Sequence, residues 1–173
     1  TGRPTGVFCQ TATHTPQRWD EAGQRYDVDV EDAAYVLMDL DNGAKVQVLT
    51  SWSTRIRRDD MMTIQVDGTQ GSAVASLRDC WVQTLADTPS PTWPQLDVAR
   101  PRADHFNEWT PAPGPRDVPA SFRVGWEAFL RHVADDADFP FPLRVGAQAL
   151  NLVECAYASA EQRRWLDVPP LDI

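Results

Sequence analysis

Residues 28–40, VDVEDAAYVLMDL, and residues 44–52, AKVQVLTSW, flank Asp41-Asn42-Gly43 and decide the fold of this chain. Both runs alternate side chains with the period of a strand, and Asn-Gly tolerates the positive φ that a tight hairpin turn requires. Val36 and Met38 share one face of the first run, and Tyr35 and Leu37 lie on the other. Because both faces are fairly apolar, we expect both to be covered.

Further strands and loops surround this hairpin. Residues 7–11 read as a short strand, and residues 61–66 and 72–77 as a second hairpin around DGTQG at 67–71. Polar loops are expected at 13–24 and 54–60. Residues 88–119 hold eight of the chain's 14 prolines, a density that blocks regular ladders and helices and indicates a long excursion.

Two helices close the chain. Phe122, Trp126, Phe129, Leu130 and Val133 recur at helical spacing, with Ser121 as a candidate N-cap. A second apolar stripe runs through Leu143–Gln162, and 164–168 reads as a final short strand. Strands followed by helices predict an α+β fold: a mostly antiparallel open twisted sheet with helices packed on one face. The other face, with Tyr35, Leu37 and Leu49, is then available for subunit contact in a dimer or larger assembly.

Composition narrows the class of protein. The length of 173 residues suits a single domain over 1–173. The net charge of −9 argues against nucleic acid and anionic membranes as partners. The three widely spaced cysteines form no CxxC, so neither a zinc site nor a disulfide framework is expected, and a cytoplasmic location fits best. We find neither a signal peptide nor an apolar run long enough for a membrane span.

Several short motifs together resemble the C-terminal domain of the glucose-fructose oxidoreductase / inositol dehydrogenase (Gfo/Idh/MocA) family, from about residue 2 to residue 168. The entry Gly2-Arg3-Pro4 with Val7 is similar to the family's G-x-P-x-x-V. The hairpin 30–44 resembles V-x-D-x-a…N-G-a, and 64–71 resembles i-x-v-x-G-t-x-G. Similarity continues at Ser51-Trp52, at 126–129 and from Gly146 to Ser159.

The resemblance implies a parent NAD(P)-dependent oxidoreductase acting on a sugar, polyol or related hydroxylated compound. The family's N-terminal Rossmann domain, its catalytic Lys and its Asp/His pair do not occur in this sequence. We therefore expect a fragment that contributes substrate pocket and oligomer interface, with no catalytic, cofactor-binding or metal-binding residue of its own. NAD or NADP would be held by the absent domain, and the fragment alone would be inactive.

Strand direction locates the expected substrate site. If the first strand runs toward the active-site end, as the resemblance implies, loops 13–24 and 54–60 converge there and both tight turns point away. The candidate substrate-binding residues are His14, Arg18, Trp52, Arg55, Arg58 and Asp60, with Trp19 a further flat apolar surface. Directional donors of this kind suit a hydroxylated substrate. Asp32 is expected to hydrogen-bond the adjoining loop.

Other interpretations stay open at this stage. The charges of 54–60 can balance one another as a solvated loop. The chain can be a stand-alone non-catalytic binding or assembly domain, or a single-domain α+β enzyme built around His14. Substrate identity, the choice between NAD and NADP, and redox direction lie beyond the sequence.

Overall fold

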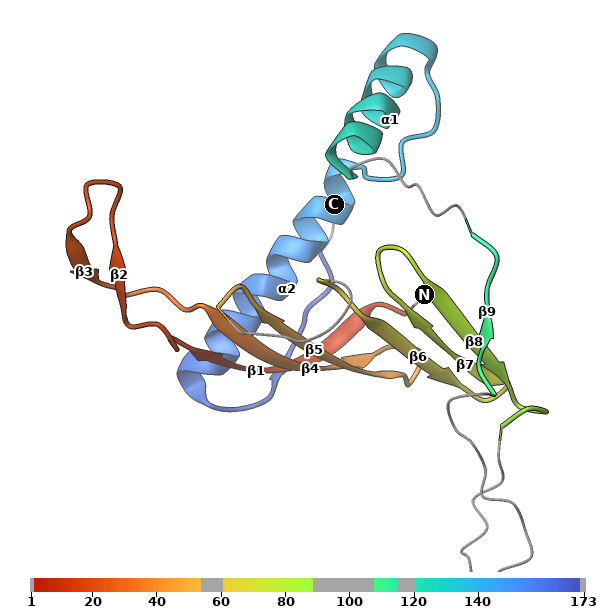
Figure 1. Cartoon of the computed structure of the whole chain (residues 1–173), viewed down its shortest axis with the longest axis horizontal. Coiled ribbons are helices and arrows are strands. Elements are labelled where there is room, and N and C mark those ends of the chain that lie inside the picture. The colour runs from red at the N-terminus through yellow and green to blue at the C-terminus, as the bar shows by residue number, and fades with distance from the viewer. Residues whose placement is uncertain (1, 54–60, 89–107, 115–120, 172–173) are drawn as a thin grey trace, which may run out of the picture. The chain divides into compact units, whose positions relative to one another are not determined.

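The computed structural model describes residues 2–53, 61–88, 108–114 and 121–171 (Figure 1). The chain groups into two compact units, one of Thr1–Ile56 with Asp138–Ile173 and one of Arg57–Ala137. The elements of the described residues are antiparallel strands and two helices, so the predicted α+β class is confirmed. The single domain expected over 1–173 stays a prediction.

The first unit is built on a four-stranded antiparallel sheet with the order β10-β1-β4-β5. Its strands are β1 (Pro4–Ala12), β4 (Ala33–Leu40), β5 (Lys45–Ser51) and β10 (Leu166–Asp167). The predicted Asn-Gly hairpin is confirmed: Gly43 has a φ of 85°, and its N–H donates to the Leu40 carbonyl at 3.0 Å. Residues 28–32 of the expected strand lie before β4 rather than in it.

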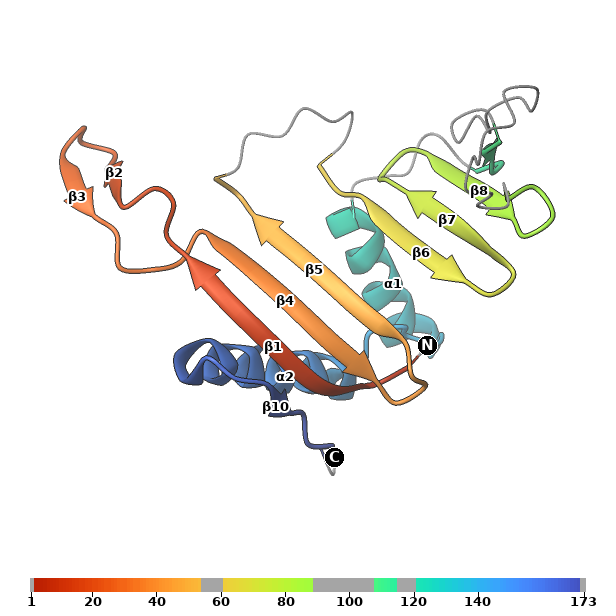
Figure 2. The same cartoon turned by 90° about the horizontal axis from the view of Figure 1, so that it is seen from below.

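Helix α2 (Leu143–Gln162) lies against β1 and covers one face of this sheet (Figure 2). Val7 and Cys9 point to the covered face and are 0% and 3% exposed. Ser159 of α2 is fully buried, and its Oγ accepts a hydrogen bond from the Cys9 N–H at 3.0 Å. The helix ends where Arg163 adopts a left-handed conformation with φ 53°, and the chain then enters β10.

The loop expected at 13–24 contains a strand. Strand β2 (Gln17–Trp19) pairs with β3 (Arg25–Asp27), and the two form a small separate sheet. The chain reverses through Asp20–Gln24, where Gly23 has a φ of 75°. Trp19 and Tyr26 favour extended backbone on either side of this turn, so three residues a side suffice for pairing. In Figure 2 the hairpin extends beyond the end of β1.

The second unit contains another antiparallel sheet, with the order β6-β7-β8-β9. The predicted second hairpin corresponds to β6 (Ile64–Gly68) and β7 (Gly71–Ala75), and β8 (Cys80–Thr84) was not anticipated. Of the proline-rich excursion, residue 88 and residues 108–114 are described, and they include β9 (Thr110–Pro111). The predicted first helix is α1 (Ser121–Asp135), in which Ser121 is the first helical residue rather than the cap.

Neither described helix is long and apolar enough to cross a membrane.

Candidate substrate-binding site at the strand ends

Three strand ends meet at one end of the first sheet. Ala12 at the end of β1 pairs with Ala33 at the start of β4, and Ala33 pairs with Ser51 at the end of β5. The Asn42-Gly43 turn lies at the opposite end, where Pro4 pairs with Leu40. The ends of β1 and β5 therefore lie at the same end of the sheet (Figure 2). Loop 54–60, expected to meet loop 13–24 here, lies outside the described residues, so its convergence stays a prediction.

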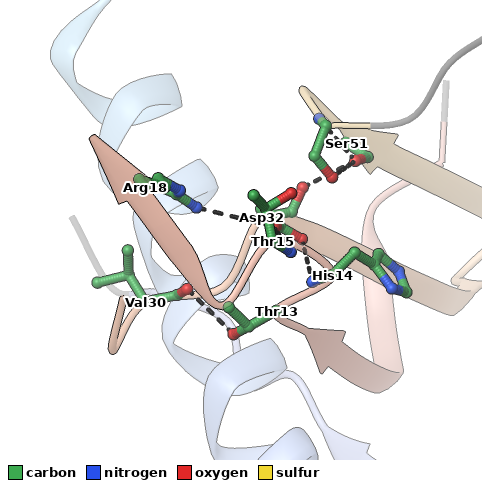
Figure 3. Close-up of polar contacts among 8 residues, drawn as sticks. Thr13, His14, Thr15, Arg18, Val30, Asp32 and Ser51 are labelled. Atoms are coloured by element: carbon green, nitrogen blue, oxygen red, sulfur yellow. Dashed lines mark hydrogen bonds and ion pairs between the residues drawn. The ribbon is translucent and has the colours of Figure 1, made fainter. Parts of the chain in front are cut away.

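Asp32 lies at the centre of this end of the sheet (Figure 3). Its side chain is fully buried, and its two carboxylate oxygens accept hydrogen bonds from successive backbone N–H groups. His14 N donates to Oδ1 and Thr15 N donates to Oδ2, both at 2.8 Å. The hydrogen bond expected between Asp32 and the adjoining loop is thus confirmed.

The ionised form of Asp32 is favoured by these contacts. Burial alone raises the pKa of the carboxyl group, because desolvation penalises its charge. The hydrogen bonds from the His14 and Thr15 backbone and from Ser53 outweigh that penalty, so the pKa lies below its ordinary value. Asp32 is therefore a buried carboxylate anion at neutral pH, and it needs a nearby positive charge.

Arg18 supplies that charge from strand β2. Its Nη2 lies 3.7 Å from Asp32 Oδ2, within ion-pair range but too far for a hydrogen bond. The guanidinium also lies over the Trp52 ring, 4.2 Å from the ring centroid, as a cation–π contact. Nε and Nη2 of Arg18 are buried, and the described residues offer neither of them a hydrogen-bond acceptor.

Trp52 follows β5 directly and is 66% exposed. Arg18 covers part of one side of its ring, and the exposed remainder is a flat apolar surface at the same end of the sheet. Trp19, the other indole considered for this role, pairs with Arg25 across the β2–β3 hairpin, whereas Arg18 pairs with Tyr26. Since successive strand residues point to opposite sides, Trp19 faces away from Arg18.

His14 places its ring on the face of the sheet that α2 leaves open. Its Nε2 lies 3.0 Å from the Tyr35 hydroxyl oxygen, and the two rings meet edge to face. The tautomer decides which group donates. Both side chains are exposed, so their polar atoms remain open to a ligand. Tyr35 was placed by the sequence only on a subunit-contact face, although its position two residues after Ala33 also brings it near this strand end.

Hydroxyl groups fix the backbone around Asp32. Ser51 Oγ donates to the Asp32 carbonyl at 2.8 Å and accepts from Ser53 N at 3.1 Å, which ties the end of β5 to the start of β4. Thr13 Oγ1 donates to the Val30 carbonyl at 3.1 Å across the base of the hairpin. These contacts hold the chain on both sides of His14 and Trp52.

Glu31 makes a second connection at the neighbouring position. The Tyr157 hydroxyl on α2 donates a short hydrogen bond to Glu31 Oε1. This bond lowers the pKa of Glu31 and raises the pKa of Tyr157. Burial and the Glu31 charge raise the pKa of the Cys9 thiol below them, so Cys9 is an inert core residue.

Of the six predicted substrate-binding residues, the structure brings His14, Arg18 and Trp52 to one strand end. We call these three residues together with Asp32 the strand-end cluster. Arg55, Arg58 and Asp60 lie outside the described residues. Across the described ranges no group of three or more His, Cys, Asp or Glu side chains is arranged to hold a metal ion, and all three cysteines are free.

A separate groove of about 400 Å³ lies at the other end of β1. Gly2, Pro4, the first half of α2 and residues 168–171 line it, largely with apolar groups. Among the described residues that line it, Arg3 alone has a titratable side chain. The described lining of the groove is therefore mainly apolar, whereas the strand-end cluster offers directional polar groups at the end of a sheet.

A helix-backed antiparallel sheet with polar groups gathered at one strand end defines an α+β domain suited to binding a small polar molecule. Comparison with known proteins finds relatives of this domain. Residues 1–74 match the model of the GFO/IDH/MocA C-terminal domain. The resemblance to the C-terminal domain of the Gfo/Idh/MocA family predicted from the sequence is confirmed.

A D-xylose dehydrogenase of Paenarthrobacter nicotinovorans is 38% identical over 177 residues, covering 99% of this chain and 45% of that protein. Among solved structures, a levoglucosan dehydrogenase in complex with NADH and levoglucosan has a TM-score of 0.73 at 18% identity, covering 98% of this chain and 46% of that one. An oxidoreductase domain protein from Kribbella flavida has a TM-score of 0.70 at 18% identity, covering 98% and 45%. The chain thus spans less than half the length of the relatives it matches.

Proposed function

We propose that this chain forms the substrate-binding and oligomerisation part of an NAD(P)-dependent oxidoreductase acting on a sugar, polyol or related hydroxylated compound. The observation that carries the proposal is the 38% identity to a D-xylose dehydrogenase over 99% of the chain. The proposal assigns the dinucleotide and the hydride chemistry to residues outside this chain. The reaction would take place in the cytoplasm.

The strand-end cluster fits a hydroxylated ligand in three ways. Arg18 has buried N–H donors to which the described residues offer no acceptor, and an unpaired buried donor is costly, which favours an oxygen-bearing ligand at this point. Trp52 presents flat apolar surface to the carbon-bound hydrogens of a sugar ring. His14 and Tyr35 hold polar atoms that can accept from or donate to hydroxyl groups.

Charge favours a neutral ligand over an anionic one within the described residues. The Arg18 charge is already balanced by Asp32, and Glu31 adds a negative charge at the next position. An anionic group such as a phosphate would meet little net positive charge among these side chains. A neutral sugar or polyol makes the same hydrogen bonds without that electrostatic cost.

Steady-state kinetics test this proposal on the protein as its gene encodes it. The substrates are D-xylose, levoglucosan and an inositol, with NAD and NADP compared and the reduced nicotinamide monitored. We expect turnover with at least one sugar, and a KM that rises about tenfold to a hundredfold in Arg18→Gln, as loss of a charged hydrogen bond predicts. Trp52→Ala is expected to raise KM in the same direction, and Trp19→Ala, on the opposite side of the hairpin, is the matched control.

An unchanged KM in both Arg18→Gln and Trp52→Ala would place the substrate elsewhere. Sugar binding without turnover with either nicotinamide cofactor would instead support a non-catalytic binding domain.

The proposal includes a homo-oligomer formed through the open face of the first sheet. Tyr35, Leu37 and Leu49 are 41%, 47% and 59% exposed there, and exposed apolar side chains on a sheet face favour burial against a second copy. Leu37→Glu with Leu49→Glu should shift the protein to monomers in analytical ultracentrifugation at micromolar concentrations. Thr50→Glu is the control, because it adds a charge to β5 on the other face. A wild-type protein that sediments as a monomer contradicts this part of the proposal.

A further inference from the structure

The Asp32 carboxylate does more than neutralise a cation. Each of its oxygens is engaged by a backbone N–H group, one from His14 and one from Thr15, at equal distances of 2.8 Å. These two bonds fix the two consecutive peptide planes on either side of the His14 Cα. The chain leaving β1 is therefore set at the residue that carries the His14 ring.

The same carboxylate leaves the hydrogen-bonding capacity of Arg18 unused. Asp32 accepts hydrogen bonds from the main chain, and the Arg18 guanidinium lies 3.7 Å from Asp32 Oδ2, outside hydrogen-bond distance. Arg18 is attracted to the buried charge and is confined on its other side by the Trp52 ring. These two contacts hold Arg18 in place. The N–H groups of its Nε and Nη2 donate to no acceptor among the described residues.

We propose that Asp32 is a positioning residue of the substrate site, which sets His14 through its backbone and Arg18 through its charge while leaving the donors of Arg18 for the substrate. This inference rests on the proposed function for the identity of the ligand. It assigns Asp32 no contact with substrate, because its side chain is 0% exposed, whereas the Arg18 side chain is 19% exposed. Its role is to fix where two ligand-facing side chains stand.

The predicted effect of Asp32→Asn follows from the groups that face it. An asparagine offers one acceptor oxygen, and its NH2 group turns a donor toward the second backbone N–H or toward Arg18. One loop bond and the attraction for Arg18 are lost together, at nearly constant side-chain volume. A displacement of about 1 Å in a ligand-binding group can cost on the order of a hundredfold in catalytic efficiency.

Glu31→Gln is a matched control. It removes the same charge from the adjacent residue of the same connection, but Glu31 bonds Tyr157 on α2 rather than the loop of His14. The glutamine keeps a carbonyl oxygen that can accept from the Tyr157 hydroxyl, so the anchor of this segment on α2 stays in place. Only Asp32→Asn disturbs the strand-end cluster.

The experiment combines two readouts on the protein as its gene encodes it. The first needs no activity: selective ¹⁵N labelling reports the His14 amide and the Arg18 Nε–H, assigned by their loss in His14→Gln and Arg18→Lys. We expect Asp32→Asn to move the His14 amide upfield and to speed solvent exchange of the Arg18 Nε–H. Glu31→Gln should leave both signals in place.

The second readout is a double-mutant cycle on KM for the best substrate of the panel. We expect Asp32→Asn to raise KM about tenfold or more alone, but much less in an Arg18→Gln background, because it acts partly through Arg18. If Asp32→Asn does not fold, Asp32→Glu replaces it, since it keeps the charge and shifts the carboxylate by one methylene.

The inference would be overturned if Asp32→Asn raised KM by the same factor in the wild type and in Arg18→Gln. It would also be overturned if Glu31→Gln raised KM as much as Asp32→Asn does. Unchanged His14 and Arg18 signals in Asp32→Asn would do so as well, whether or not the enzyme turns over. Absence of turnover in the wild type refutes the proposed function alone, because the two NMR signals still decide the positioning role.

Discussion

Replacement of Ser159 by alanine tests the connection between helix α2 and the first sheet. Strand β10 pairs with β1 only at Gly6 and Val7, so the Cys9 N–H lies beyond its reach. The Ser159 hydroxyl takes over that position: it accepts from Cys9 N at 3.0 Å and donates to the Arg164 carbonyl at 2.6 Å. A helical side chain thereby completes the hydrogen bonding of a buried strand.

The cost can be estimated from the two groups that lose a partner. Cys9 is 3% exposed, so its N–H would stay unsatisfied, at about 1–3 kcal/mol. Arg164 is an exposed residue, and water can replace the lost bond to its carbonyl at little cost. We therefore expect Ser159→Ala to lower the free energy of unfolding of this unit by about 2 kcal/mol.

Chemical denaturation combined with amide hydrogen exchange measures this effect. Exchange at Cys9 should accelerate in Ser159→Ala more than exchange elsewhere in β1. Thr13→Val is the control, because it deletes an exposed hydroxyl bond in the same unit and should cost no more than about 0.5–1 kcal/mol. Equal stability of Ser159→Ala and wild type, with the Cys9 amide still protected, would show that this hydroxyl does not complete the strand.

Two further predictions concern close packing and acid stability. Gly6→Ala should destabilise the first unit by about 1–3 kcal/mol in denaturant melts, because a Cβ there would clash with Trp165 Nε1, and Gly6→Ala with Trp165→Ala should recover part of that loss. The folded-state pKa of Asp32 lies below its unfolded value, so its contribution to stability is present above about pH 4 and is lost as pH falls through the folded pKa. In Asp32→Asn the free energy of unfolding should therefore fall less steeply as pH is lowered below about 4, as measured by denaturation at a series of pH values. An unchanged slope would show that other groups cause the loss of stability in acid.

Local patterns in the sequence were sufficient for the long elements. The alternation of Tyr35, Val36, Leu37 and Met38 is reproduced as exposed and half-buried positions in turn, and the Asn42-Gly43 turn follows from local turn chemistry. Helix α2 has the predicted bounds, although its end depends on Arg163 in a left-handed conformation rather than on a glycine. These elements depend on interactions among near neighbours, which a sequence displays directly.

Short elements depended on pairing that the sequence does not display. Strands β2 and β3 have three residues each, too few for a visible alternation, and form because Gly23 allows the chain to turn back. The contacts of the site also depend on strand pairing that the sequence does not display. Asp32 could be assigned to the adjoining loop by proximity, but its bonds to His14 and Thr15 require the register in which Ala12 meets Ala33. The contact of Arg18 with Trp52 depends on that hairpin as well.

The segment before β4 connects the covering helix α2, through Glu31, with the loop after β1, through Asp32. These two consecutive carboxylates lie just before β4, and each has a different partner. Glu31 bonds Tyr157 of the covering helix, and Asp32 bonds the loop that carries the site. Loosening α2 therefore shifts the backbone from which Asp32 acts, even though no residue of α2 contacts Asp32 through a described hydrogen bond. It follows that Tyr157→Phe, which removes only the hydroxyl, should speed exchange of the Arg18 Nε–H less than Asp32→Asn does, but more than a substitution at an exposed residue of α2 such as Glu161→Gln.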